Sequence, residues 1–361
     1  MTSTAPAGEI EAMLTATSPQ ALRPELVDAY RVAMTRVSAD DWNALRRRAD
    51  AACDLARRAF VDDDRAAWEV VQVAEWRLQR AGHLRPTDPG DVLVLDAFYR
   101  IEESTLPDFD LPAGLTPAEF CRKLTDDIAP YSALESPTIK IMQSGTLGRA
   151  DWEYFGYQWL APSGDFTRMI ALASLPLPHR FSRFMYHNLF DEAGRGTWER
   201  AHQYLLEQFL AELGVDVGDE EKLLYWSAPE HVALVNGQNR LLWHREAAWS
   251  LGSMYLYEKL LPFELASIRD GLLRLGVPRD KLAWFDEHIV VDVSHAEDWL
   301  GVVESFLLTH EEQRLAYRAA MERGRLGRVS WDCMYPGWER WKETGTPPHL
   351  PARELREATG L

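Results

Sequence analysis

Several features that define common protein classes are scarce or absent in this sequence. Its 361 residues include three cysteines, Cys53, Cys121 and Cys333, and their wide spacing gives neither a disulfide framework nor a CxxC metal-binding pair. The first residues have no basic segment followed by an apolar core, so no signal peptide is indicated. No run approaches the roughly 18 consecutive apolar residues of a membrane helix. We therefore expect a cytoplasmic protein with no membrane partner.

Positively charged residues are also scarce relative to negatively charged ones. The chain has 39 Lys and Arg residues against 56 Asp and Glu residues, and a formal net charge of −17. Nucleic acids and anionic membranes bind basic surfaces, so we expect neither as a partner. Hydrophobic residues make up 46% of the chain, which is enough for one large core or two smaller ones. The composition therefore predicts an ordered globular protein.

The dominant pattern that is present is helical. Apolar residues recur at steps of three and four through most of the chain, whereas the alternation typical of a β-strand is hard to find. Capping boxes at Thr116–Glu119 and Thr309–Glu312 indicate helix starts. The dipeptide Asn236-Gly237 predicts a turn, and separate helices are expected over 240–260 and 263–275. The sequence therefore predicts an all-α protein.

The predicted helices divide into three regions. Residues 1–112 are expected to form a helical N-terminal extension, and residues 113–342 a helical bundle. Residues 343–361 are rich in proline and are expected to form a loosely held tail. For the extension, packing and the formation of a homodimer are the two roles that we consider.

A histidine motif in the bundle is the first candidate for chemistry. His288, Asp292 and His295 are spaced i, i+4 and i+7 on a helix expected over 279–308. At about 100° per residue, the three side chains fall within roughly 60° of one another. Two imidazoles and a carboxylate on one face suit a non-haem iron. The alternative is a hydrogen-bonded core histidine at 288 and a capping histidine at 295.

Other helices supply further candidate ligands. Glu192 is expected at a helix end before a glycine-containing break, with His202 one to two turns into the next helix. Glu258 lies in the apolar run Trp249–Leu261, where a carboxylate is costly unless it is paired or binds a metal. The alternative is an exposed Glu258 beside Lys259. A helical bundle can build a dinuclear iron or manganese site from three such carboxylates and three imidazoles.

At these positions the sequence resembles the haem-oxygenase-like diiron oxidases and oxygenases, a family of iron-containing redox enzymes. The family pattern has a Glu in an N-L-x-[DE]-E-x-G stretch and a His about ten residues later. A Glu inside an apolar helix follows, and then H-x-x-x-D-x-x-H. The matching positions in this chain are Glu192, His202, Glu258, His288, Asp292 and His295. The resemblance covers roughly residues 145–310 and implies a seven-helix haem-oxygenase-like bundle.

The resemblance also implies cofactors and ligand roles. These are O₂ and two Fe(II) ions, the second of them held weakly, with manganese as the alternative metal. Glu192, His202 and Glu258 would then hold one ion, and His288, Asp292 and His295 the other. The three carboxylates would be the catalytic groups, and one of them would bridge the ions. Some members have an extra carboxylate, for which Glu153 and Asp165 are nearby but out of register.

For the reaction, the resemblance implies a small-molecule substrate, and we expect an aliphatic free amino acid in natural-product biosynthesis. A peroxo-diiron intermediate would abstract hydrogen, leading to desaturation, cyclisation or C–C cleavage, or would oxygenate an amine. A fatty-acid oxidative decarboxylase on the same fold, a haem enzyme and a non-catalytic helical binding protein remain as alternatives. Candidate substrate contacts are Arg168, His244 and Tyr255, since Arg can grip a carboxylate. For each of them, ordinary packing or a salt bridge is the alternative.

Overall fold

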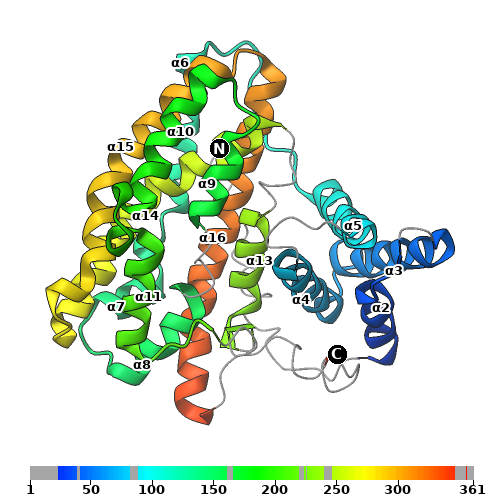
Figure 1. The fold of residues 1–361 in the computed structure, drawn as a ribbon, viewed down its shortest axis with the longest axis horizontal. Helices are drawn as coiled ribbons and strands as arrows, with labels where there is room; N and C mark the ends of the chain where they lie inside the picture. Colours follow the sequence, from blue (N-terminus) through cyan, green and yellow to red (C-terminus); the bar gives the residue numbers. More distant parts are fainter. Residues whose placement is uncertain are drawn as a thin grey trace. The chain divides into compact units, whose positions relative to one another are not determined.

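The computed structural model describes residues 23–38, 41–81, 88–160, 166–218, 223–224, 226–239, 246–345 and 355. Over these ranges the regular secondary structure is helical and contains no β-strand, which confirms the all-α prediction (Figure 1). No helix in the same ranges is long and apolar enough to span a membrane.

The chain forms two compact units. The first consists of Met1–Pro107, Glu220–Asn236 and Arg340–Leu361, and the second of Asp108–Asp219 and Gly237–Glu339. The predicted division near residue 112 stays a prediction, as does the loosely held tail, most of which lies outside the described residues. The helices of the first unit are α2 (Pro24–Met34), α3 (Trp42–Phe60), α4 (Arg65–Ala81) and α5 (Pro89–Thr105).

The second unit contains most of the predicted bundle. Its α-helices are α6 (Pro117–Ile128), α7 (Pro137–Gln143), α8 (Arg149–Phe155), α9 (Phe166–Ser174), α10 (His179–Glu192), α11 (His202–Leu213), α14 (Ala247–Leu275) and α15 (Ala283–Phe306). Two more helices have residues in both units, namely α13 (Pro229–Asn239) and α16 (His310–Thr344). Shorter helical turns connect them, namely η1 (Ala129–Tyr131), η2 (Ala133–Glu135), η3 (Gly156–Leu160), η5 (Gly194–Gly196), η6 (Trp198–Arg200) and η8 (Arg279–Leu282).

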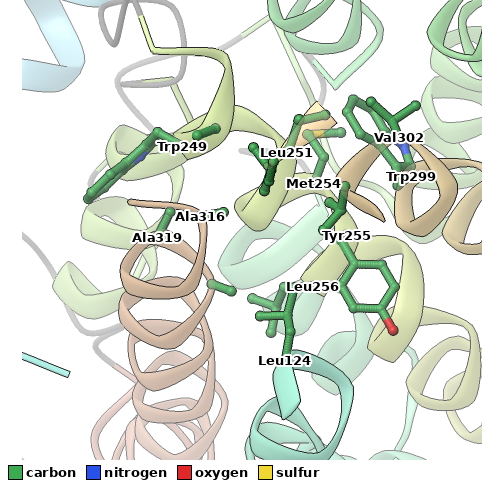
Figure 2. Close-up of a cluster of buried hydrophobic side chains, with 14 of the residues drawn as sticks. Leu124, Trp249, Leu251, Met254, Tyr255, Leu256, Trp299, Val302, Ala316 and Ala319 are labelled. Atoms are coloured by element: carbon green, nitrogen blue, oxygen red, sulfur yellow. The ribbon is translucent and has the colours of Figure 1, made fainter. Parts of the chain in front are cut away.

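The core of the second unit is formed where α6, α14, α15 and α16 meet. Figure 2 shows Leu124 from α6, Met254 from α14 and Trp299 from α15 packed with Ala316 from α16. A Cβ at Gly252 on α14 would overlap the backbone of Ala316. Glycine is therefore required for the close approach of α14 and α16.

Both predicted capping boxes are present. The Thr116 amide donates to Glu119 at 2.9 Å, and the Glu119 amide donates to the Thr116 hydroxyl at 3.3 Å. The amides of Thr309 and Glu312 make the same exchange at 2.9 and 3.3 Å. These side chains satisfy amides that have no partner within the helix, which fixes the starts of α6 and α16.

Two local predictions in the bundle are wrong. The helix α14 continues through Pro262, although a break was expected there. Because proline has no N–H, this helix lacks the bond that would go to the Glu258 carbonyl, but burial of the helix outweighs that loss. Asn236-Gly237 lies inside α13 rather than in a turn. The side chain of Arg323 occupies the space that a side chain at Gly237 would need.

Candidate metal centre

A tight turn between α10 and α11 brings the first two predicted ligands together. Glu192 is the last residue of α10, and His202 is the first residue of α11 rather than one to two turns into it. Gly194 has φ +76°, and a Cβ there would overlap the backbone of Ala201. Arg195 follows with φ +55°. This compact turn places His202 Nδ1 3.0 Å from Glu192 Oε1.

The other four predicted ligands lie on two neighbouring long helices. Glu258 is on α14, and His288, Asp292 and His295 are on one face of α15. All six predicted ligands are buried, with at most 4% of any of them exposed. The helical spacing that suggested the motif therefore corresponds to an inward-facing stripe.

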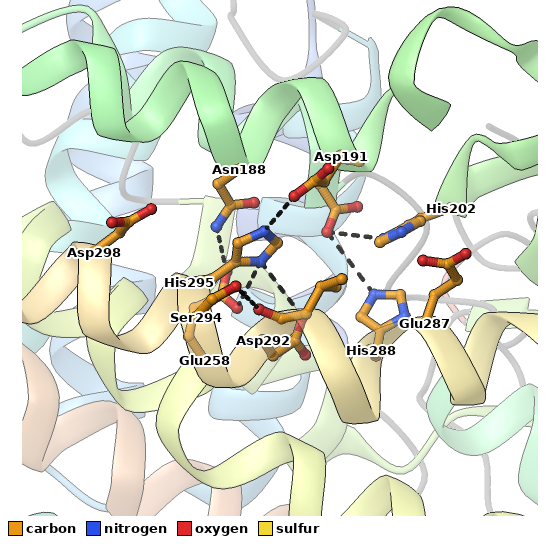
Figure 3. A network of polar contacts seen from close by, with 12 residues as sticks. Asn188, Asp191, His202, Glu258, Glu287, His288, Asp292, Ser294, His295 and Asp298 are labelled. Carbon is orange, nitrogen blue, oxygen red and sulfur yellow. Dashed lines mark hydrogen bonds and ion pairs between the residues drawn. The ribbon is translucent and has the colours of Figure 1, made fainter.

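The six side chains form two groups of three (Figure 3). In the first group, Glu192 Oε1 lies 3.0 Å from His202 Nδ1 and 3.8 Å from His288 Nε2. In the second, His295 Nδ1 lies 3.4 Å from Glu258 Oε2 and 3.5 Å from Asp292 Oδ1. Within each group the candidate ligand atoms all lie within 4.8 Å of one another.

The grouping differs from the expected one. Glu258 was expected beside Glu192 and His202, but it lies with Asp292 and His295. His288 takes its place in the first group. The reason is geometric, because His288 is one turn of α15 before Asp292 and therefore faces the α10–α11 turn, whereas Glu258 faces the later part of α15.

Protein groups fix the orientation of two imidazoles. His288 Nδ1 lies 2.7 Å from the Trp284 carbonyl, which can only accept, so Nδ1 carries the proton and Nε2 faces Glu192. His295 Nε2 lies 3.2 Å from Asp191 Oδ2, which leaves Nδ1 to face Glu258. Metal-ligating histidines have this arrangement, with the second ring nitrogen bonded to a carbonyl or carboxylate.

Sequence reasoning assigned no role to two polar residues that support the ligands. The Asn188 amide donates to Glu258 Oε1 at 2.7 Å, and Asp191 accepts from His295 and from Arg195 Nε at 2.5 Å. Both lie in the same N-L-x-D-E stretch as Glu192. The signal in the sequence was their position, because Asn188 lies one helical turn before Glu192 and Asp191 directly precedes it. The ligands that they support, however, lie on other helices.

The first group holds the protonation states that bind metals. Burial opposes ionisation of Glu192, but His202 and His288 keep the pKa of its carboxyl below the ordinary value. Burial, together with the nearby His202, lowers the pKa of His288 to about 4. A carboxylate and a neutral imidazole are therefore favoured near neutral pH, and both have lone pairs to donate.

The second group carries an excess of negative charge. Burial and the neighbouring Glu258 raise the pKa of the Asp292 carboxyl well above its ordinary value. Burial alone would lower the pKa of His295, but Asp292 and Glu258 raise it to about 11. His295 therefore holds a proton near neutral pH, and a bound cation would displace it.

Four buried atoms face one another in these groups without a well-aligned hydrogen bond. They are Glu192 Oε1, His202 Nδ1, Asp292 Oδ1 and His295 Nδ1. Leaving a buried polar atom unpaired costs about 1–3 kcal/mol, and more for a charged group. A cation in each group would satisfy these atoms, and mixed carboxylate and imidazole ligands suit iron or manganese. The residues present therefore fit a metal ion in each group.

The remaining candidates lie apart from the two groups. The Tyr255 hydroxyl lies 2.7 Å from the Thr125 hydroxyl on α6, and Arg168 is an exposed residue of α9. Glu153 is on α8 and belongs to neither group. His244 and Asp165 lie outside the described residues. Any substrate role for Arg168, His244 or Tyr255 stays a prediction.

Comparison with known proteins extends this picture. Residues 153–328 match the model of a family of iron-containing redox enzymes. A solved domain of unknown function with a heme oxygenase-like fold from Shewanella denitrificans has a TM-score of 0.51 and 16% identity. That alignment covers 64% of this chain and 96% of the domain. A CadD-like protein of unknown function from Nostoc punctiforme has a TM-score of 0.49 and 19% identity, over 60% of this chain and 96% of its own. No curated protein matches this chain.

The match and the geometry apply to the same part of the chain. The six predicted ligands all lie between residues 153 and 328, and the bundle that contains them has the heme oxygenase-like fold of the Shewanella domain. Within this bundle, residues 153–328 are similar to the family of iron-containing redox enzymes.

Proposed function

We propose that this protein is an O₂-dependent non-haem diiron oxidase that acts on a small aliphatic substrate, with a free amino acid as the preferred class. The proposal is carried by the two buried groups of carboxylates and imidazoles. In the second group, the ring nitrogen of His295 that faces away is held by Asp191. In a binding protein without a metal, four buried polar atoms would be left without well-aligned hydrogen bonds, which is unfavourable.

The first metal ion would be held by Glu192, His202 and His288, and the second by Glu258, Asp292 and His295. The two groups are electrostatic neighbours, because Glu192 raises the pKa of Asp292 and His295 lowers the pKa of Glu192. Two iron ions bound here would supply the electrons that reduce O₂.

The chain's own residues would control water and protons at this site. Trp284 packs with a tilted ring against His288, the ring centroids being 4.2 Å apart, and Phe285 packs edge-on against Phe209 at 5.0 Å. These rings keep water away from one side of the first group. On the second group, the ionised Asp191 accepts from His295 Nε2, so this nitrogen would keep its proton when Nδ1 binds a metal ion.

Anaerobic loading with Fe(II) followed by exposure to O₂ tests the proposal. We expect about two iron ions per chain and iron-dependent O₂ consumption in the wild type. Replacement of His288, Asp292 or His295 by alanine should abolish that consumption and lower the iron content. His310→Ala, at an exposed position on α16, is the matched control.

Other outcomes would support different functions. Full iron content and O₂ consumption in all three alanine variants would contradict the proposed ligands. A Soret band after haem addition would indicate a haem enzyme, and absence of any bound metal after loading would indicate a binding protein.

A further inference from the structure

A second buried polar cluster lies outside the metal centre, on α16. Arg323 and Glu322 are both 0% exposed, and the NH2 group of Arg323 donates to Glu322 Oε1. Within the part of the chain that the structure describes, Arg323 Nε and NH1 and Glu322 Oε2 have no hydrogen bond. The pair thus presents unused donors from the arginine and an unused acceptor from the glutamate.

The neighbouring helices leave room for this pair. A Cβ at Gly237 on α13 would overlap the Arg323 guanidinium, so that position has to be glycine for the arginine to lie where it does. Tyr257 on α14 also contributes a buried hydroxyl, which interacts with the side chain of Gln238 on α13. The Arg323 charge acts on this hydroxyl, so the two side chains lie close together.

The cluster adjoins the metal centre along α14. Tyr257 directly precedes Glu258, one of the six predicted ligands, and consecutive Cα atoms are about 3.8 Å apart. The two side chains point about 100° apart around the helix axis. A ligand held by Arg323 and Tyr257 would therefore be close to the second group of metal ligands.

The unused atoms define the chemistry of that ligand. The donors of Arg323 call for an anionic acceptor such as a carboxylate, and Glu322 Oε2 calls for a cationic donor such as an ammonium group. Buried charged groups are costly unless their hydrogen bonds are made. A ligand that carries a carboxylate and an ammonium group on the same carbon atom adds no net charge to the buried pair. A fatty acid would satisfy Arg323 but would bring a second carboxylate close to Glu322.

We propose that Arg323, Glu322 and Tyr257 form the binding site for the α-carboxylate and α-ammonium groups of a free amino acid. This inference rests on the proposed function, because it assigns the residues that select the substrate of the metal centre. Binding itself needs neither iron nor O₂, so it can be measured on its own.

Changing the ligand tests the proposal on the wild-type chain. Isothermal titration would compare the aliphatic L-amino acids of proteins and L-lysine with analogues that lack one group. For leucine these are 4-methylpentanoic acid and 3-methylbutylamine. We expect at least one amino acid to bind, and its two analogues to bind about 100-fold more weakly. Equal binding of the acid, or no binding by any amino acid of the panel, would overturn the proposal.

Changing the protein tests the assigned residues. We expect Arg323→Gln and Glu322→Gln to weaken amino-acid binding by roughly 10- to 100-fold, and Tyr257→Phe by less. Arg314→Gln on the same helix is the control, since Arg314 pairs with Glu311 at 2.8 Å and is partly exposed. Unchanged affinity in a folded Arg323→Gln variant would overturn the proposal. If that variant does not fold, the amino-acid affinity of Glu322→Gln and the affinities of the ligand analogues for the wild type provide the test.

The iron content of the same preparations separates the two proposals. A chain that binds iron but no amino acid would refute the binding site and leave the diiron function standing. A chain that binds amino acids through Arg323 but no iron would refute the diiron function alone.

Discussion

Three of the six predicted ligands are held by a residue that is not itself a predicted ligand. Asn188 bonds Glu258, the Trp284 carbonyl bonds His288, and Asp191 bonds His295. Because Arg195 in turn bonds Asp191, the orientation of His295 depends on a chain of contacts that reaches the α10–α11 turn. Such supporting bonds fix the ring orientation before a metal arrives.

Asp191→Asn should weaken metal binding without unfolding the bundle. The amide oxygen can still accept from His295, but the negative charge and part of the bond to Arg195 are lost. We expect a loss of about 10- to 100-fold in affinity for Fe(II) or Mn(II), measured by anaerobic titration. Asp270→Asn, at a partly exposed position on α14, should have no effect on metal binding. Wild-type affinity in the Asp191 variant would show that His295 does not need this support.

Glu264 gives the bundle a pH-dependent stability. Burial raises the pKa of its carboxyl to about 7, although the Ala133 amide donates to it at 2.7 Å. Between its ordinary pKa and pH 7 the folded state holds the proton and the unfolded state does not, so stability falls as the pH rises through this window. The shift corresponds to about 3 kcal/mol.

Urea unfolding at pH 4.5 and pH 8 measures this effect. The free energy of unfolding of Glu264→Gln should lose less between these pH values than that of the wild type, by up to about 3 kcal/mol. The same loss in both proteins would show that Glu264 does not titrate in this window.

At the residue scale, the sequence was sufficient to select six side chains that come together in the structure, but not to group them. Spacing on α15 and the isolated acid in an apolar helix identified His288, Asp292, His295 and Glu258. Which of them face Glu192 depends on how α10, α14 and α15 pack, and no local pattern contains that information. The roles of Asn188 and Asp191 were missed for the same reason.

At the scale of elements, the α10–α11 turn positions two of the three residues of the first group, Glu192 and His202. Its geometry depends on Gly194, where a Cβ would overlap backbone, and on positive φ at three successive residues. The sequence indicated a break at these glycines, but the position of His202 at the first residue of α11 follows from the left-handed turn itself.

Gly194→Ala and Gly196→Ala form a matched pair that tests this turn. Both residues have positive φ, but a Cβ at Gly196 meets no atom within 4 Å. We expect Gly196→Ala to cost about 1 kcal/mol of stability and to keep the metal affinity. Gly194→Ala should cost more, about 2–4 kcal/mol, and should also weaken metal binding, since it moves Glu192 from His202. Denaturant unfolding and metal titration measure both effects; equal behaviour of the two variants would contradict the role of the turn.

Two further elements show where local rules fail. Pro262 and Asn236-Gly237 are typical of helix ends and turns, yet both lie within helices. In each case a tertiary contact decides, because Pro262 is buried with its helix and Gly237 makes room for Arg323. Gly237, where the local rules predicted a turn, is thus the residue that makes room for the second polar cluster.

At the scale of the whole molecule, the fold class was predictable, but the discontinuous composition of the first compact unit was not. Helical periodicity runs through the sequence, so the all-α architecture follows from local patterns. Residues 220–236 belong to the same compact unit as the N-terminal helices, although they are far from them in sequence. A discontinuous unit of this kind leaves no compositional boundary in the chain. Three acidic residues of the −17 net charge lie in the metal centre, where cations would neutralise them.

The most direct test of the account is the position of iron in crystals of the anaerobically Fe(II)-loaded protein, located by anomalous scattering at the iron edge. If each group binds an iron ion, one peak is expected among Glu192, His202 and His288, and a second among Glu258, Asp292 and His295. Absence of iron from both groups, or iron bound elsewhere in the chain, would contradict it.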